Sequence, residues 1–146
     1  MSQPKYALQI TGPDGWEQAE GLEGSLVAWV VPTRDDGDFR ANVVVVAVDA
    51  AESIDEVRAQ HGEALLDGLI DARLLDVAPA SVAGRDASYA LAAAVAGDDE
   101  DVTVEQWLVL ADDRTLTITA TVPTPEYLET VGEVRALIDS VEITDA

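Results

Sequence analysis

The stretch Phe39–Val48 constrains the fold more than any other part of the chain. In an extended strand, successive side chains point to opposite faces of the sheet. From Val43 onward both faces are apolar, whereas a half-exposed strand would keep alternating with polar residues. Four consecutive β-branched valines also disfavour a buried helix. The stretch therefore predicts an interior strand of a sheet that is covered on both faces.

Other segments of alternating or continuous apolar character, bounded by turn signals, predict the remaining strands. The loops between them are short, which favours antiparallel pairing. Pro32 and Pro79 are each expected to end a strand. The sequence thus predicts a single antiparallel sheet of about six to seven strands. Eight segments are candidates for these strands, the first and the last of them short: 6–10, 24–31, 39–48, 73–77, 87–96, 102–111, 115–122 and 140–143.

Two segments with a period of 3.6 residues predict helices. The first begins at Ser53, where a serine followed three residues later by Glu56 forms a capping box, and it should end near Gly68 in a left-handed conformation. The second should begin with Thr124 as its cap and Pro125 at its first position. The fold class is therefore α+β, with a central antiparallel sheet flanked by helices in one domain, residues 1–146.

The net charge limits the kinds of partner that the protein can bind. Eight basic against 29 acidic residues give −21, so the surface repels phosphate backbones and nucleic acid is excluded as a partner. There is no cysteine, no apolar run long enough to span a membrane and no apolar region of a signal peptide in the first twenty residues. We expect a soluble, cytoplasmic protein without membrane insertion.

Residues that could carry chemistry are scattered. The acid clusters at 35–38, 98–101 and 112–113 lack the ligand spacing of a calcium loop, so no metal site is predicted. His61, the only histidine, lies on the apolar stripe of its helix without a catalytic companion and is expected to pack in the core. No phosphate-binding loop or serine elbow occurs. We expect neither an enzyme nor a cofactor.

A binding face is the remaining candidate site. Glu105 and Trp107 share one side of their predicted strand. Neighbouring strands could place Trp107 beside a threonine ladder and a row of small residues, forming a groove for an apolar segment. The alternative is that a helix covers Trp107. The predicted binding residues are Trp107, Glu105, Thr117, Thr119, Ala90 and Ala92.

Several short motifs, taken in order, resemble one family. They run from Pro13–Trp16 through Phe39–Val45, Ser53–Leu66, Val82–Ala87 and Thr119–Pro123 to Ser140–Val141. The chain is similar in these to the DcrB-like and LpqN-like proteins, relatives of the photosystem protein PsbP and of a Ran-binding nuclear import factor. The resemblance implies a sheet with helices on its faces and a non-enzymatic role in binding other proteins, as lipoproteins, assembly factors or Eag-type secretion chaperones.

Three functional hypotheses follow. The first is a protein-binding adaptor or chaperone, in its finer form secretion-associated and shielding an apolar segment of an unidentified partner protein. The second is a small-molecule or lipid-binding module with a pocket between sheet and helix. An enzyme using acidic residues ranks last. The chain itself is expected to be a monomer or a homodimer.

Overall fold

The computed structural model describes residues 6–10, 16–19, 25–30, 41–49, 53–96, 100–111 and 114–145. Its elements within these ranges, in chain order, are β1 (Tyr6–Gln9), β2 (Glu17–Ala19), β3 (Ser25–Val30), β4 (Asn42–Asp49), α1 (Ile54–Asp67), β5 (Ile70–Val82), β6 (Arg85–Ala96), β7 (Glu100–Ala111), β8 (Arg114–Pro123), the 3₁₀ turn η2 (Thr124–Glu126), α2 (Tyr127–Asp139) and β9 (Glu142–Asp145).

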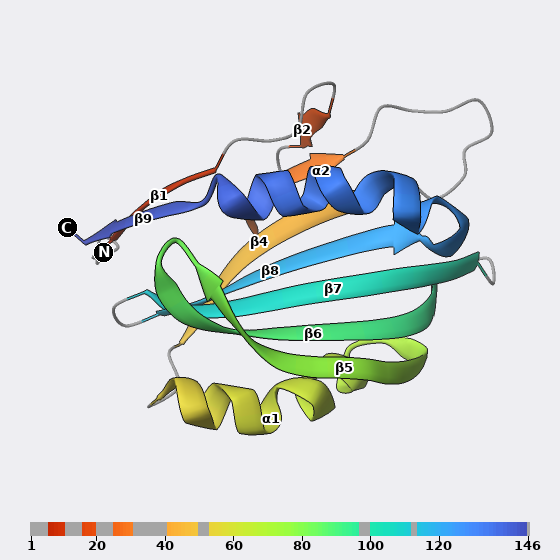
Figure 1. The fold of residues 1–146 in the computed structure, drawn as a ribbon, viewed down its shortest axis with the longest axis horizontal. Helices are drawn as coiled ribbons and strands as arrows, with labels where there is room; N and C mark the ends of the chain where they lie inside the picture. The colour runs from red at the N-terminus through yellow and green to blue at the C-terminus, as the bar shows by residue number, and fades with distance from the viewer. Residues whose placement is uncertain are drawn as a thin grey trace.

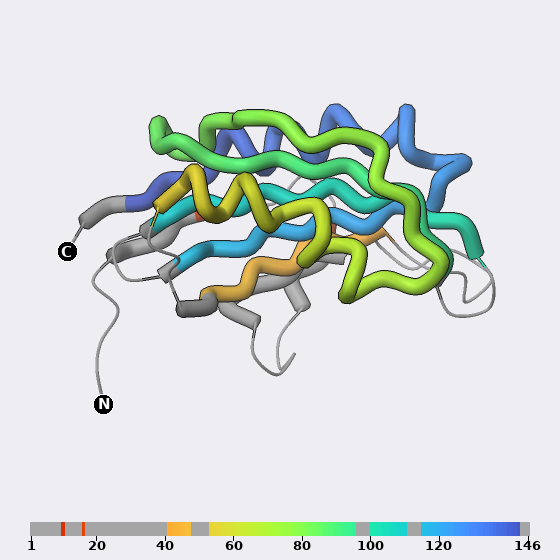
Figure 2. Tube along the Cα trace, turned by 90° about the horizontal axis from the view of Figure 1, so that it is seen from below, coloured from red at the N-terminus to blue at the C-terminus, as the bar shows by residue number. Residues whose placement is uncertain are grey.

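The main sheet has seven antiparallel strands in the order β2-β3-β4-β8-β7-β6-β5. Five of them are long, and β2 and β3 are short. The helices α1 and α2 lie on opposite faces of this sheet (Figures 1 and 2). The predicted α+β fold with a central antiparallel sheet and flanking helices is therefore confirmed.

Strand β4 occupies an interior position, as the run of valines predicts. It pairs with β3 on one side and with β8 on the other. Val43 and Val45 are fully buried beneath α2, while Val44 and Val46 on the opposite face are half-buried. The strand begins at Asn42, and the predicted first residues Phe39 and Arg40 lie outside the described residues.

Helix α1 begins as the capping box predicts. The Ser53 side chain accepts a hydrogen bond from the Glu56 amide at 3.2 Å, which satisfies one of the free N–H groups of the first turn. Val57, His61 and Leu65 face the sheet at four-residue spacing. The helix ends at Gly68, but with φ −93° this glycine is not left-handed as expected.

The prediction that Pro79 ends its strand is wrong. Strand β5 runs through it to Val82, where the two-residue turn Ala83–Gly84, both at positive φ, leads into β6. Counting back from that turn, the pairing of Pro79 with Ser88 is a non-hydrogen-bonded one. The N–H that proline lacks would therefore point to the free edge of the sheet, so no ladder bond is lost.

The short strand β2 follows Trp16 and is not among the strands expected from the sequence. Two further expectations need correction. The strands are not all in one sheet, because β1 and β9 pair with each other in a separate two-stranded ladder. Thr124 does not cap α2. Its Oγ1 lies at hydrogen-bond distance, 3.1 Å, from Oγ1 of Thr103, and the turn η2 stands between Thr124 and the start of the helix.

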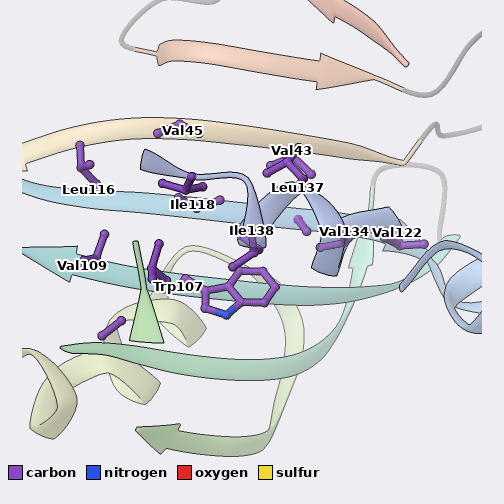
Figure 3. Close-up of a cluster of buried hydrophobic side chains, with 14 of the residues drawn as sticks. Val43, Val45, Trp107, Val109, Leu116, Ile118, Val122, Val134, Leu137 and Ile138 are labelled. Atoms are coloured by element: carbon purple, nitrogen blue, oxygen red, sulfur yellow. The ribbon is translucent and has the colours of Figure 1, made fainter. Parts of the chain in front are cut away.

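The main core lies between α2 and the sheet. It combines the inward residues of β4, β7 and β8 with Val134, Leu137 and Ile138 of α2 (Figure 3). Trp16 packs against this core, and its indole N–H donates to the Glu133 carboxylate of α2. A smaller core lies beneath α1, where Leu65 meets alanines of β6 and valines of β7.

Candidate functional site

The six predicted binding residues do not share one face of the sheet. Trp107 is paired with Tyr89 on β6 and with Ile118 on β8, so these three side chains point to the side of α2. Thr117 and Thr119 are one position out of phase with Ile118 and point to the side of α1. The expectation of a single groove is wrong, because the register places Trp107 and Glu105 on one face and Thr117, Thr119, Ala90 and Ala92 on the other.

Trp107 is covered by α2 and is only 3% exposed, as the alternative interpretation has it (Figure 3). Its ring lies 5.2 Å from that of Tyr89, at an interplanar angle of 52°. The guanidinium of Arg135 on α2 lies 5.2 Å from the centre of both rings. A cation over two aromatic faces is an attractive arrangement. Trp107 therefore serves to attach α2 and is not an open anchor for a partner.

Glu105 lies beside this aromatic pair and is 1% exposed. Its Oε2 accepts hydrogen bonds from Arg135 Nη2 at 2.6 Å and from the hydroxyl of Tyr89. Its Oε1 has no hydrogen-bond partner among the described residues. A buried carboxylate is expensive without a counter-charge, and Arg135 supplies that charge. We call Glu105, Tyr89, Trp107 and Arg135 the α2 latch.

The latch affects the acidity of its tyrosines. Burial, together with the hydrogen bond and charge of Glu105, raises the pKa of Tyr89 well above its ordinary value. Burial raises the pKa of Tyr127 as well, and the nearby charge of Glu105 adds to the effect. Both phenols therefore stay protonated at neutral pH and serve as hydrogen-bond donors. The two phenols are therefore not poised to exchange a proton near pH 7, which suits a structural role.

On the opposite face, His61 is buried as predicted and joins a chain of polar side chains. Its Nδ1 lies 2.7 Å from Ser88 Oγ and its Nε2 3.0 Å from Gln106 Oε1. Gln106 Nε2 donates to Thr119 Oγ1 at 3.0 Å, and the Oε1 of the same amide is directed at His61. We therefore assign the proton to His61 Nε2, so that Nδ1 accepts from the Ser88 hydroxyl. Burial lowers the pKa of His61, and the bond to Gln106 only partly opposes this.

This His61 chain resembles a catalytic serine–histidine pair in its distances but not in its accessibility. Ser88 is completely buried, and His61 is 1% exposed. A nucleophile must reach its substrate, so this hydroxyl cannot serve as one in the folded protein. Ala90 and Ala92, from the same face of β6, are buried beneath α1, which explains why that face is small.

The exposed apolar side chains gather at the sheet edge instead. Of the five large apolar side chains that are exposed in the described part of the chain, four lie on β5, and the fifth is Leu128 on α2. Ile70 is 63% exposed and Leu75 is 55% exposed. Strand β5 pairs with β6 and forms the edge opposite β2 (Figure 1). We call Ile70, Leu74, Leu75 and Val77 the β5 strip.

Sequence reasoning missed the β5 strip because it treated Arg73–Val77 as an ordinary strand. One signal was available. A strand that contains a proline is demoted to a sheet edge, and apolar residues on an edge strand are exposed on more sides than those of an interior strand. Pro79 therefore pointed to an edge position for the four apolar residues that precede it.

Within the described ranges, the structure shows neither a cluster of metal-binding side chains nor a helix that could span a membrane. No group of three or more histidine or acidic side chains there is arranged to hold a metal ion. The acid clusters at 35–38 and 112–113, and half of that at 98–101, lie outside these ranges. Neither α1 nor α2 is long and apolar enough to cross a membrane.

Comparison with known proteins gives similarity in fold alone. No protein-family model and no curated protein matches the chain. Among solved structures, LpqN of Mycobacterium tuberculosis, described as involved in cell envelope biogenesis, matches with a TM-score of 0.81 and 15% identity over 98% of this chain and 86% of that chain. The Ran-binding protein Mog1p of Saccharomyces cerevisiae matches with a TM-score of 0.65 and 17% identity over 95% and 91%.

The cyanobacterial PsbP protein of Synechocystis sp. PCC 6803 also matches, with a TM-score of 0.59 and 13% identity over 93% of this chain and 92% of that chain. These identities are too low to carry function across, because one fold serves many functions. The likeness to LpqN and PsbP implied by the sequence motifs is confirmed at the level of the fold, and the likeness to DcrB-like proteins stays a prediction. The chain has the fold that LpqN, Mog1p and cyanobacterial PsbP share.

Proposed function

We propose that this protein is a non-enzymatic binding protein that holds an apolar segment of another protein along the β5 strip. One observation carries the proposal, namely that four of the five exposed large apolar side chains gather on a single edge strand. Scattered exposed apolar residues need no explanation, whereas four within the single stretch Ile70–Val77 of an edge strand favour an interaction site. Fully burying an exposed aliphatic side chain contributes roughly 1.5–3 kcal/mol, and each of these four side chains, 37% to 63% exposed, would contribute part of that to holding a partner.

Shielding an apolar segment is the work of an adaptor or a chaperone. A partner segment that is destined for a membrane or for another subunit would otherwise expose its apolar residues to water. One structural neighbour supports a binding role, since Mog1p is Ran-binding, and another, LpqN, is involved in cell envelope biogenesis. The burial of Ser88 and His61 supports the absence of hydrolytic activity.

Site-specific crosslinking in the native host tests this proposal. A photo-reactive phenylalanine derivative would replace Leu75 in one variant and Leu128 in another. Leu128 is the matched control, because it is an exposed leucine on α2 and lies outside the β5 strip. We expect position 75 to give a discrete adduct with one partner protein and position 128 to give none. Identical adducts at both positions, or none at position 75, would contradict the proposal.

A small-molecule or lipid-binding module is the second hypothesis. One observation favours it, namely the buried Oε1 of Glu105, which has no hydrogen-bond partner in the described residues. Against it, the space between α2 and the sheet is filled with packed side chains. Native mass spectrometry of the purified protein would decide, since a bound ligand adds a fixed mass that a Glu105→Gln variant should lose.

A further inference from the structure

We infer that the partner of the β5 strip is a basic amphipathic helix, which contacts the strip through its apolar side chains and the acidic residues around it through lysines or arginines. This inference rests on the proposed function and adds the chemistry and the conformation of the partner segment. Two observations carry it, the irregular backbone of β5 and the charge of the surface beside it.

The backbone of β5 is poorly suited to receive another strand. Its register shifts twice, between Ile70 and Arg73 and between Leu74 and Asp76, and Asp71 has a positive φ of 48°. Pro79 removes one of the N–H groups that would face an added strand. Bulges and prolines are the devices by which edge strands resist strand addition. The partner must therefore be recognised through side chains, which a helix can present without using its backbone hydrogen bonds.

Helix α1 packs closely against part of the strip. A Cβ atom on Gly62 would lie 2.7 Å from Leu74 Cδ2 and 3.4 Å from Val77 Cγ2, so the glycine allows α1 to pack closely against β5. Leu74 and Val77 remain 39% and 37% exposed despite this contact. The two elements lie side by side in Figure 1. Leu74 and Val77, which pair with Ala92 and Ala90, thus lie on the face of β5 next to α1, whereas Ile70, which pairs with Val95, lies on the other face of the same edge.

The charge around the strip is negative. Residues 53–82, which include α1 and β5, contain six acidic residues and two arginines. Their net charge is therefore −4, with His61 neutral. The exposed carboxylates of this region include Glu63, Asp67, Asp71 and Asp76. A second copy of the chain would bring the same charge and a total of −21, which opposes self-association. A basic partner gains from the same charge, both in affinity and in association rate.

The test uses a model peptide as the probe. It is a helix of about 20 residues with leucines on one face and lysines on the other, and a second peptide carries glutamates in place of the lysines. Binding to the full chain is measured by fluorescence anisotropy at about 0.05 M and about 0.5 M sodium chloride, between which screening changes strongly. We expect the lysine peptide to bind, more weakly at high salt, and the glutamate peptide not to bind.

Two pairs of variants separate the strip from general attraction to an acidic protein. Leu74→Ser with Leu75→Ser should weaken binding about tenfold or more, because apolar contacts are lost without a change of charge, and Leu128→Ser should leave it unchanged. The triple change Glu63→Gln, Asp71→Asn and Asp76→Asn should weaken binding and flatten its salt dependence. The distal triple Glu129→Gln, Asp139→Asn and Glu142→Gln changes the net charge equally and should have a much smaller effect.

Several outcomes would overturn the inference. They are equal effects of the local and distal triples, binding of the glutamate peptide, no binding of the lysine peptide at low salt, or undiminished binding of a lysine peptide whose helix is broken by two central prolines. Crosslinking from position 75 to a second copy of the chain would also overturn it. If position 75 crosslinks to a partner whose contact segment is not basic, this inference fails while the proposed function stands.

Discussion

His61 uses both of its ring nitrogens inside the fold, and this determines how its environment responds to acid. The neutral ring accepts from Ser88 and donates to Gln106. A protonated ring would have to donate at both nitrogens, so the Ser88 hydroxyl would lose its acceptor in a fully buried site. The lowered pKa of His61 is consistent with this cost.

We predict that His61 makes the protein less stable as the pH falls below about 6.5, the ordinary pKa of histidine. In that range the unfolded chain binds a proton that the folded chain, with its lowered pKa, does not bind. The contribution of the neutral ring is therefore complete above pH 6.5 and is lost between that value and the lower folded pKa. Urea denaturation between about pH 8 and pH 5 measures the free energy of unfolding across this window.

The control is His61→Gln, which cannot titrate and retains hydrogen-bonding groups. Its stability should change less over the same pH range, and the difference between the two curves isolates the imidazole from the 29 carboxyl groups. His61→Ala should cost roughly 2–4 kcal/mol at pH 8, because it leaves a cavity and two unpaired polar groups. Parallel pH curves for the natural protein and His61→Gln would show that the imidazole does not titrate on unfolding.

Helix α2 is held to the sheet partly by the ion pair between Arg135 and Glu105. Arg135 is half-exposed, whereas its partner Glu105 is buried on β7. The two ends of the ion pair are therefore not equivalent. Removing the arginine leaves a buried carboxylate with neutral hydrogen-bond donors such as Tyr89 but no counter-charge, whereas removing the charge of the glutamate leaves an arginine that water can still reach.

We predict that Arg135→Met destabilises the protein more than Glu105→Gln does. The first change should cost about 3 kcal/mol and the second about 1 kcal/mol. The double variant should recover part of the loss, because a neutral amide in place of the Glu105 carboxylate needs no counter-charge. Thermal and urea denaturation of the four proteins form a double-mutant cycle. A double variant whose loss equals the sum of the single losses would mean that the two residues do not interact.

Most of the helices and strands were predictable, because the period of their apolar residues is visible in the local sequence. The valines of β4 and the alternating threonines of β8 gave their strands directly, and the box Ser53–Glu56 gave the start of α1. Thr124 misled because its hydroxyl bonds to Thr103, a partner 21 residues away. A competing tertiary contact of this kind leaves no mark in local sequence.

The candidate site was harder to predict because it depends on register. The pairing of Ala111 with Arg114 places Trp107 opposite Ile118. Because polar Thr117 and apolar Ile118 alternate along the strand, this register separates Trp107 from the threonines. The partners of His61 had no such signal, because Ser88 and Gln106 lie 27 and 45 residues away.

At the scale of the whole molecule, the folded state has to hold a charge of −21 in a compact volume. Self-repulsion between like charges lowers the stability of a compact state relative to an expanded one. The described cations are largely engaged locally, since Arg135 pairs with Glu105 while Arg58 donates to the Ala87 carbonyl and pairs with Asp55. Most of the acidic surface therefore depends on solvent and salt for its screening.

We predict that the melting temperature rises with sodium chloride, by roughly 3 °C between 0.1 M and 1 M, for about 1 kcal/mol of relieved repulsion. Screening causes the rise, since the Debye length falls from about 10 Å to about 3 Å over that range. Calcium at matched ionic strength should add little, and the salt effect should shrink near pH 4, close to the isoelectric point of about 4.1. Calorimetry measures both. A large stabilisation by micromolar calcium would reveal a specific site in the acid clusters at 35–38 or 98–101, and a flat response to sodium chloride would mean that solvation alone already neutralises the repulsion.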